Sequence, residues 1–175
     1  SGWFNEGNCN REGWGGVSGG YLLGFHGWNP GQARVYQNVA TTGGVLKFTT
    51  YAKIEPGATN VSSLNMRMEW FKGDGTSVQT NILNLLNSIP HTYQWEEVYI
   101  AAACNQPGVQ YARVSVAGEW GTSTHAENKS ILFDDMTLVA ISTNLQNPSF
   151  DIGSGESTPG WYSWSKELAR IEGWT

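Results

Sequence analysis

The sequence predicts an all-β protein built as a two-sheet antiparallel β-sandwich of the jelly-roll type. Helical periodicity of apolar residues is nearly absent, and short segments in which apolar and polar residues alternate recur along the chain. Turn-forming Gly, Pro and Asn separate these segments. The 22 glycines, and the Asn, Ser and Thr that fill most polar positions, are typical of secreted β-proteins.

The alternating segments define the expected strands in order along the chain. They span residues 21–26, 33–40, 45–54, 64–72, 78–86, 94–103, 110–118 and 131–141. The turns between them are indicated by NPGQ, TTGG, EPGATN, KGDG, NQPG and GEWGTST, which are rich in residues that favour chain reversal. This number of short strands, with turns this frequent, favours two packed sheets.

Alternation also predicts which side chains face the core, because neighbouring residues of a strand point to opposite faces of its sheet. The predicted inward set from three strands is mostly apolar: Val35, Gln37, Val39, Met66, Met68, Trp70, Ala112, Val114 and Val116. The predicted outward set is Arg34, Tyr36, Asn38, Arg67, Glu69, Phe71, Arg113 and Ser115. The outward set is unusual for a plain surface, since it repeatedly places aromatic rings beside Arg, Glu and Asn.

Length and charge restrict the classes of protein that fit. A chain of 175 residues fits one domain, residues 1–175, with a sizeable core. The net charge of −5 and the lack of a Lys/Arg run argue against a nucleic-acid partner. No apolar run approaches the roughly 20 residues that cross a bilayer, and no basic-then-apolar leader is present. We therefore expect a mature, extracellular piece of protein without a membrane partner.

The two cysteines leave two interpretations open. Cys9 and Cys104 could form one disulfide in an oxidising compartment, or they could be two unpaired thiols. Spacing in the sequence cannot decide between them, because a disulfide requires two Cα atoms that lie close together in space.

Several motifs, in order, resemble those of a known group of proteins. The stretches are GGYLLGFHGWNPGQARVYQNVATTGGVLKFTTYAKIEPG at 19–57, YQWEEVYIAAACNQPGVQYARVSVAG at 93–118 and ILFDDMTLV at 131–139. They resemble the jelly-roll carbohydrate-binding modules of families four, nine, sixteen and twenty-two. The resemblance covers most of the chain, although each motif alone is weak. It implies a sandwich that binds a polysaccharide or oligosaccharide.

One motif of these modules is displaced in this chain. Their opening strand, N-P-S-F-E, is missing near residue 1, and a similar stretch, NPSFD, occurs at 147–151. Residues 143–175 followed by residue 1 would restore the usual order, so the chain resembles a circularly permuted module. Ser1 and Thr175 are then expected to be neighbours, because the termini of a domain often lie close together.

The alternative is a tandem array cut out of phase, with 143–175 the start of a second module. Those 33 residues cannot bury their own apolar surface, so an ordered tail needs a partner. The partner is expected to be the vacant strand position in the same sandwich, which gives a monomer, or in a neighbour's, which gives a domain-swapped assembly.

Tryptophans are candidates for the sugar site, because aromatic rings stack on the C–H face of a sugar while polar groups reach its hydroxyls. Trp28 in GFHGWNPGQ and Trp120 in GEWGTST lie among turn residues, where a large ring has little to pack against. Sugar stacking and packing within the loop are both open for these two. Core positions are expected for Trp70, Trp95 and Trp161. Trp3, Trp14, Trp164 and Trp174 fit either a rim of the site or a satellite cluster.

Four polar candidates lie on strands: Tyr36, Arg67, Glu69 and Arg113. The resemblance implies that the strands of Arg113 and Glu69 line a concave ligand-binding face. The alternative is an ordinary solvated sheet face, whose surface ion pairs contribute little free energy.

A structural calcium ion is the expected cofactor. The resemblance implies an ion that ties the first and last strands together, and Asp134, Asp135 and Asp151 match its positions. Calcium takes carboxylate and carbonyl oxygens, but Asp stands at 151 where Glu is usual, which shortens the reach. The alternative is an acidic strand end without a metal. His26, His91 and His125 lack the spacing of zinc ligands.

Together these features favour a non-catalytic carbohydrate-binding module, attached to a polysaccharide-degrading catalytic domain. One alternative is a structural or adhesive spacer that uses its aromatics only for packing. A jelly-roll glycosidase or polysaccharide lyase is the other alternative. Catalysis of glycoside hydrolysis needs two carboxylates roughly 5–10 Å apart. The pairs Glu96–Glu97 and Asp134–Asp135 point to opposite faces of their strands, so neither pair fits.

Overall fold

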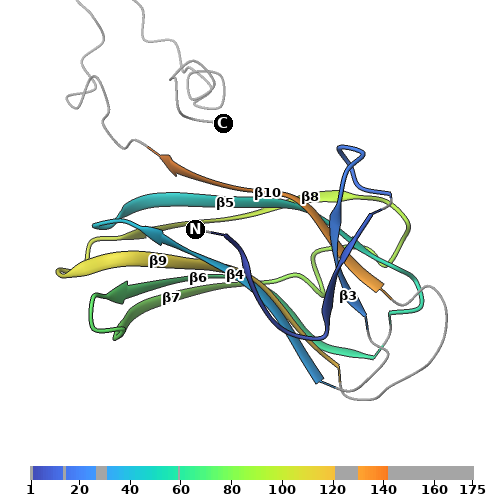
Figure 1. The fold of residues 1–175 in the computed structure, drawn as a ribbon, viewed down its shortest axis with the longest axis horizontal. Coiled ribbons are helices and arrows are strands. Elements are labelled where there is room, and N and C mark those ends of the chain that lie inside the picture. Colours follow the sequence, from blue (N-terminus) through green and yellow to red (C-terminus); the bar gives the residue numbers. More distant parts are fainter. Residues whose placement is uncertain (1, 14, 27–30, 59, 121–129, 142–175) are drawn as a thin grey trace, which may run out of the picture.

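A computed structural model describes residues 2–13, 15–26, 31–58, 60–120 and 130–141 of the chain (Figure 1). Within these ranges all regular structure is β-strand, and no helix could span a bilayer. The strands are β1 (Phe4–Gly7), β2 (Cys9–Glu12), β3 (Leu22–His26), β4 (Gly31–Ala40), β5 (Gly44–Ile54), β6 (Val61–Lys72), β7 (Ser77–Asn84), β8 (Glu96–Cys104), β9 (Val109–Trp120) and β10 (Ser130–Ile141).

The strands form two antiparallel sheets that pack face to face (Figure 1). The first sheet has the order β1-β4-β9-β6-β7, and the second has the order β2-β3-β10-β5-β8. Strand β9 lies at the centre of the first sheet and β10 at the centre of the second. The predicted fold class, an antiparallel β-sandwich, is therefore confirmed.

All the predicted strands occur, with shifts of a few residues at their ends, and two further strands were not predicted. Strands β1 and β2 have the sequences FNEG and CNRE, which show no apolar alternation and are mostly exposed. Their pairing with β4 and β3 fixes them, rather than any periodicity of their own.

The predicted faces are confirmed for the central strands. Side chains of Met66, Met68, Trp70, Val114 and Val116 are fully buried between the sheets. Their neighbours in sequence point to the other side of the first sheet, as the two-residue period of a strand requires. Gln37 and Val39 are only half-buried, because they lie on the part of β4 beyond its pairing with β1.

The core is closed by aromatic rings from both sheets. Phe25 of β3 makes an edge-to-face contact with Phe133 of β10, with ring centroids 5.3 Å apart. Trp70 is fully buried, as predicted. Trp95 was predicted to lie in the core, and this is wrong: it is half-buried, and Lys53 Nζ lies 4.7 Å from its ring centroid. The reason is that Trp95 precedes β8, so the alternation of that strand does not extend to it.

The cysteines are unpaired, which settles the open question about a disulfide. Cys9 belongs to β2 and Cys104 to β8, and these strands form opposite edges of the second sheet. Three strands lie between them, so the strands are separated by about 19 Å at a spacing of about 4.8 Å per strand. That separation is far beyond the reach of a disulfide.

Replacement of a fully buried methionine tests the packing between the sheets. We expect Met68→Ala to lower the free energy of unfolding by about 2–5 kcal/mol, because it leaves a cavity beneath β6. Urea denaturation provides the measurement. Ile82→Ala is the matched control, since Ile82 is 57% exposed and should change stability by only about 0.5 kcal/mol. Equal effects of the two substitutions would contradict this assignment of faces.

Thiol labelling tests the placement of the cysteines. Partial burial raises the pKa of Cys9 and outweighs the lowering effect of its hydrogen bonds with Asn5 and with the backbone of Glu6. The neutral thiol is thus favoured in the folded protein, and alkylation of Cys9 should be slower at pH 8 than in the unfolded chain. The rate should rise as pH approaches the raised pKa. A Cys9→Ser variant should react only after unfolding, because Cys104 is buried; rapid labelling of this variant would show that Cys104 is accessible.

Candidate functional site

The outer face of the first sheet carries aromatic, cationic and amide side chains from four neighbouring strands. We call this surface the arginine–aromatic face and define it by Phe4, Arg34, Tyr36, Asn38, Arg67, Glu69, Phe71, Tyr111, Arg113 and Ser115. Strand alternation brings these residues to one side, and antiparallel register decides which of them are neighbours.

The register sets two rows across the sheet. In one row, Asn38 of β4 lies opposite Arg113 of β9, which lies opposite Glu69 of β6. In the next row, Ser115 of β9 lies between Tyr36 and Arg67. Side chains that are directly opposite in an antiparallel pair have Cβ atoms about 4.5–5.5 Å apart, so each row is a set of contacting residues.

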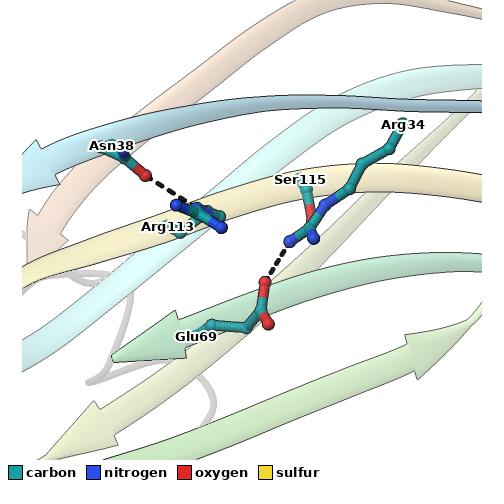
Figure 2. Close-up of polar contacts among 5 residues, drawn as sticks. All are labelled: Arg34, Asn38, Glu69, Arg113 and Ser115. Carbon is teal, nitrogen blue, oxygen red and sulfur yellow. Dashed lines mark hydrogen bonds and ion pairs between the residues drawn. The ribbon is translucent and has the colours of Figure 1, made fainter. Parts of the chain in front are cut away.

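An ion pair crosses the centre of the face. The guanidinium of Arg34 reaches over β9 to Glu69 Oε2, and the same nitrogen donates to Ser115 Oγ at 3.4 Å (Figure 2). Arg34 lies opposite Ala117, whose small side chain leaves room for this diagonal path. The two charged side chains are 21% and 16% exposed, so water screens their attraction less than it would at an open surface.

Arg113 is held between two aromatic rings. Its guanidinium carbon lies 4.6 Å from the ring centroid of Tyr36 and 5.1 Å from that of Phe71. Its Nε donates to Asn38 Oδ1 at 2.9 Å (Figure 2). Cation–π contacts and this hydrogen bond together fix the orientation of the guanidinium.

Two further rings extend the face on either side of Arg113. Phe4 of β1 stacks on Tyr36 with centroids 5.4 Å apart, and Tyr111 stacks on Phe71 at 4.9 Å with an interplanar angle of 9°. Phe4 is 51% exposed, whereas Phe71 is nearly buried. The face thus combines flat apolar surface with hydrogen-bonding groups whose positions are already fixed.

The predicted strand candidates come together, whereas the tryptophans do not. Tyr36, Arg67, Glu69 and Arg113 all lie on the arginine–aromatic face. Trp120 does not: it is 3% exposed and packs edge-to-face on Phe25 at 6.0 Å. Sugar stacking on Trp120 is therefore corrected to core packing.

The physical reason for the error is the length of a strand. Strand β9 continues to residue 120 instead of ending at 118, so its alternation carries Trp120 inward with Val114 and Val116. Trp28, Trp14, Trp161, Trp164 and Trp174 lie outside the described residues. Trp3 is 40% exposed, with its ring centroid 6.1 Å from that of Phe48.

Sequence reasoning missed Arg34, Asn38, Phe4 and Tyr111 as site residues. The alternation of β4 had placed Arg34 and Asn38 outward, but nothing in the sequence pairs Arg34 with Glu69, 35 residues away. Phe4 belongs to a strand without alternation. The sequence did hold one indication of Arg34 and Asn38. Alternation places them on the same side of their strand as Tyr36, which was already a candidate.

Two of the expected calcium ligands, Asp134 and Asp135, are adjacent on β10 in the described part of the chain. Asp134 is buried, and its carboxylate accepts hydrogen bonds from the backbone N–H of Val17 at 2.7 Å and of Asp135 at 2.8 Å. Asp135 is exposed and accepts from Ser18 Oγ at 2.9 Å. The described residues contain no group of three acidic, His or Cys ligands. Asp151 lies outside them, so a calcium site that includes Asp151 stays a prediction.

Comparison with known proteins shows the fold. No protein-family model matches the chain, and no curated protein sequence matches it. The structure is similar to TmCBM61 solved with β-1,4-galactotriose (14% identity, TM-score 0.54, 80% of this chain and 89% of that one). It is also similar to the CBM22-2 xylan-binding domain of Paenibacillus barcinonensis Xyn10C (15%, TM-score 0.51, 79% and 91%).

A third similar structure is an enzyme. The enzymatically active domain of bacteriophage CBA120 tailspike protein 4 matches with 12% identity and a TM-score of 0.56 over 79% of this chain. The match spans only 19% of the length of that chain. At such identities the likeness shows the fold, which is the β-sandwich of carbohydrate-binding modules, as the sequence resemblance predicted.

A double-mutant cycle tests the ion pair at the centre of the face. We expect Arg34→Ala and Glu69→Ala to show a coupling of about 1 kcal/mol in the free energy of unfolding, at the upper end of surface pairs because both side chains are mostly covered. Arg34→Ala combined with Glu97→Ala, on β8 of the other sheet, should be additive within about 0.5 kcal/mol. Additivity in both cycles would mean that the pair contributes nothing.

Proposed function

We propose that this chain is a non-catalytic carbohydrate-binding module that holds a polysaccharide on the arginine–aromatic face. The observation that carries the proposal is the fixed guanidinium of Arg113 between the rings of Tyr36 and Phe71, beside Asn38 and the Arg34–Glu69 pair. Rings flanked by Arg and Glu on one sheet face favour sugar binding over a spacer role, for which a face of small polar residues would suffice.

The chemistry of the face matches the two sides of a sugar. Apolar ring surface accepts the C–H face of a pyranose, while guanidinium, amide and carboxylate groups reach its hydroxyls. The groups are already oriented by contacts with one another, so binding orders few additional side chains. The face runs from β1 to β6, about 14 Å at the usual strand spacing, which fits several linked sugars better than one.

Binding is favoured over catalysis at this face. Glu69 is the carboxylate in the central row, and it is paired with Arg34. A glycosidase needs a second carboxylate across the substrate. The tailspike likeness supports an enzyme only at the level of a fold that many functions share.

The named similarities support a glycan ligand and a place in a larger protein. One similar module was solved with a galactotriose, and another is described as a xylan-binding domain of Xyn10C. By analogy, this chain would act outside the cell and hold a polysaccharide-degrading domain on its substrate.

Affinity gel electrophoresis over a panel of soluble glycans, including β-1,4-galactan and xylan, tests the proposal. We expect retardation by at least one glycan and a loss of affinity of about 2- to 10-fold for Tyr36→Ala, which corresponds to about 0.5–1.5 kcal/mol per ring. Arg113→Ala should lose at least as much, because it removes a polar contact and releases both rings.

Tyr99→Ala is the matched control, since Tyr99 is 56% exposed on β8 of the other sheet and should bind as the unchanged chain does. Retardation by no glycan would refute the proposed function. Equal losses for Tyr36→Ala and Tyr99→Ala would move the site away from this face.

A further inference from the structure

Half of β10 has a strand partner on one side only, among the strands that the structure describes. Residues Ser130–Phe133 pair with β3, and the strand pairs with β5 along nearly its whole length. From Thr137 to Ile141 no described strand lies on the side away from β5. The free edge begins beyond the register shift between Asp134 and Thr137.

An open pocket of about 310 Å³ lies where β3 stops following β10, next to the start of this free edge. Its lining includes the apolar Leu23, Phe133 and Met136 and the polar Arg11, Asp134 and Asp135. Met136 and Leu138 pack against the core but are only half-buried.

The facing edge of the other sheet is also open. Strand β1 covers β4 only as far as Tyr36, and Val39 beyond it is half-buried. An unpaired edge beside partly exposed apolar residues favours the addition of another strand.

The chain itself continues directly from this edge. Residues 142–146 follow β10, and then comes NPSFDI at 147–152, in which Phe150 and Ile152 alternate with Ser149 and Asp151. Such alternation is typical of a strand with one buried face. The connection 142–146 is short enough for a β-hairpin, so little loop entropy opposes the return of the chain.

Register decides whether this strand would fit. If Asn147 lies opposite Ile141 in an antiparallel pair, then Phe150 lies opposite Leu138 and Ile152 opposite Met136. Both apolar side chains would then lie on the core side of the sheet beside Met136 and Leu138, because opposite residues of a pair share a face. Ser149 and Asp151 would point to solvent.

We propose that residues 147–152 form a strand on the free edge of β10, so that this chain closes its own sandwich from its C-terminal side. The proposal is independent of the proposed function, since the arginine–aromatic face belongs to the other sheet. It also assigns a structural role, an edge strand, to the displaced NPSFD motif at 147–151. A second copy of the chain could offer the same strand, and the experiment below separates the two sources.

Hydrogen exchange on the full chain, residues 1–175, tests the strand. Amides of Thr137–Ile141 that point away from β5 should exchange at least 10-fold more slowly than in an unstructured peptide. Phe150→Asp should remove that slowing while β6 and β9 keep theirs, because it places a charge against Leu138. Ser149→Asp adds the same charge on the outward side and should leave exchange unchanged. Fast exchange of these amides in the unchanged chain would overturn the proposal.

A disulfide identifies the source of the strand. In a Cys9→Ser background, Val139→Cys with Ser149→Cys should oxidise to a bond within one chain, at a rate independent of protein concentration. Val139→Cys with Ser163→Cys is the control, because residue 163 lies beyond the proposed strand. A bond between two chains would assign the strand to a second copy. A yield no higher than that of the control would refute the register. Either result overturns the proposal.

Discussion

The structure depends on one constraint: the two-residue alternation of β9, which is held in register by neighbours on both sides. Its inward residues, among them Val114 and Val116, pack in the core, and its outward residue Arg113 lies at the centre of the arginine–aromatic face. Strands β4 and β6 pair with β9 along most of its length. A slip of one residue would bury Arg113 and expose the valines, so hydrophobic burial fixes the geometry of the polar face as well.

Burial also shapes the electrostatics of that face. Ser115 is fully buried although it points outward, because the guanidinium of Arg34 covers it on the way to Glu69. The cover reduces the access of water to the ion pair, and it leaves Nε of Arg34 and of Arg67 without a partner among the described residues. Both of these Nε atoms are buried, so they are not available to a ligand on the face.

The sequence predicts what is periodic, and it misses what depends on pairing or on a strand's end. The alternation of three strands was enough to place Glu69 and Arg113 on one face, because a strand's period is a local property. The link from Arg34 on β4 to Glu69 on β6 crosses β9, so it needs the strand order, which no local pattern contains. Trp120 was misjudged because GEWG resembles a turn, whereas pairing extends β9 through it. Only tertiary contacts decide where such a strand stops.

The arginine–aromatic face and the free edge of β10 lie on different sheets. Arg113, Glu69 and Tyr36 lie on β9, β6 and β4, and each of these strands has a partner on both sides. The free edge of β10 lies in the other sheet, with the core between them. A closing strand at that edge would add burial beside Leu138 and raise the stability of the whole sandwich, because a small domain unfolds as one unit. It would not displace the ligand face, since the register of β9 is already fixed by the strands on either side of it.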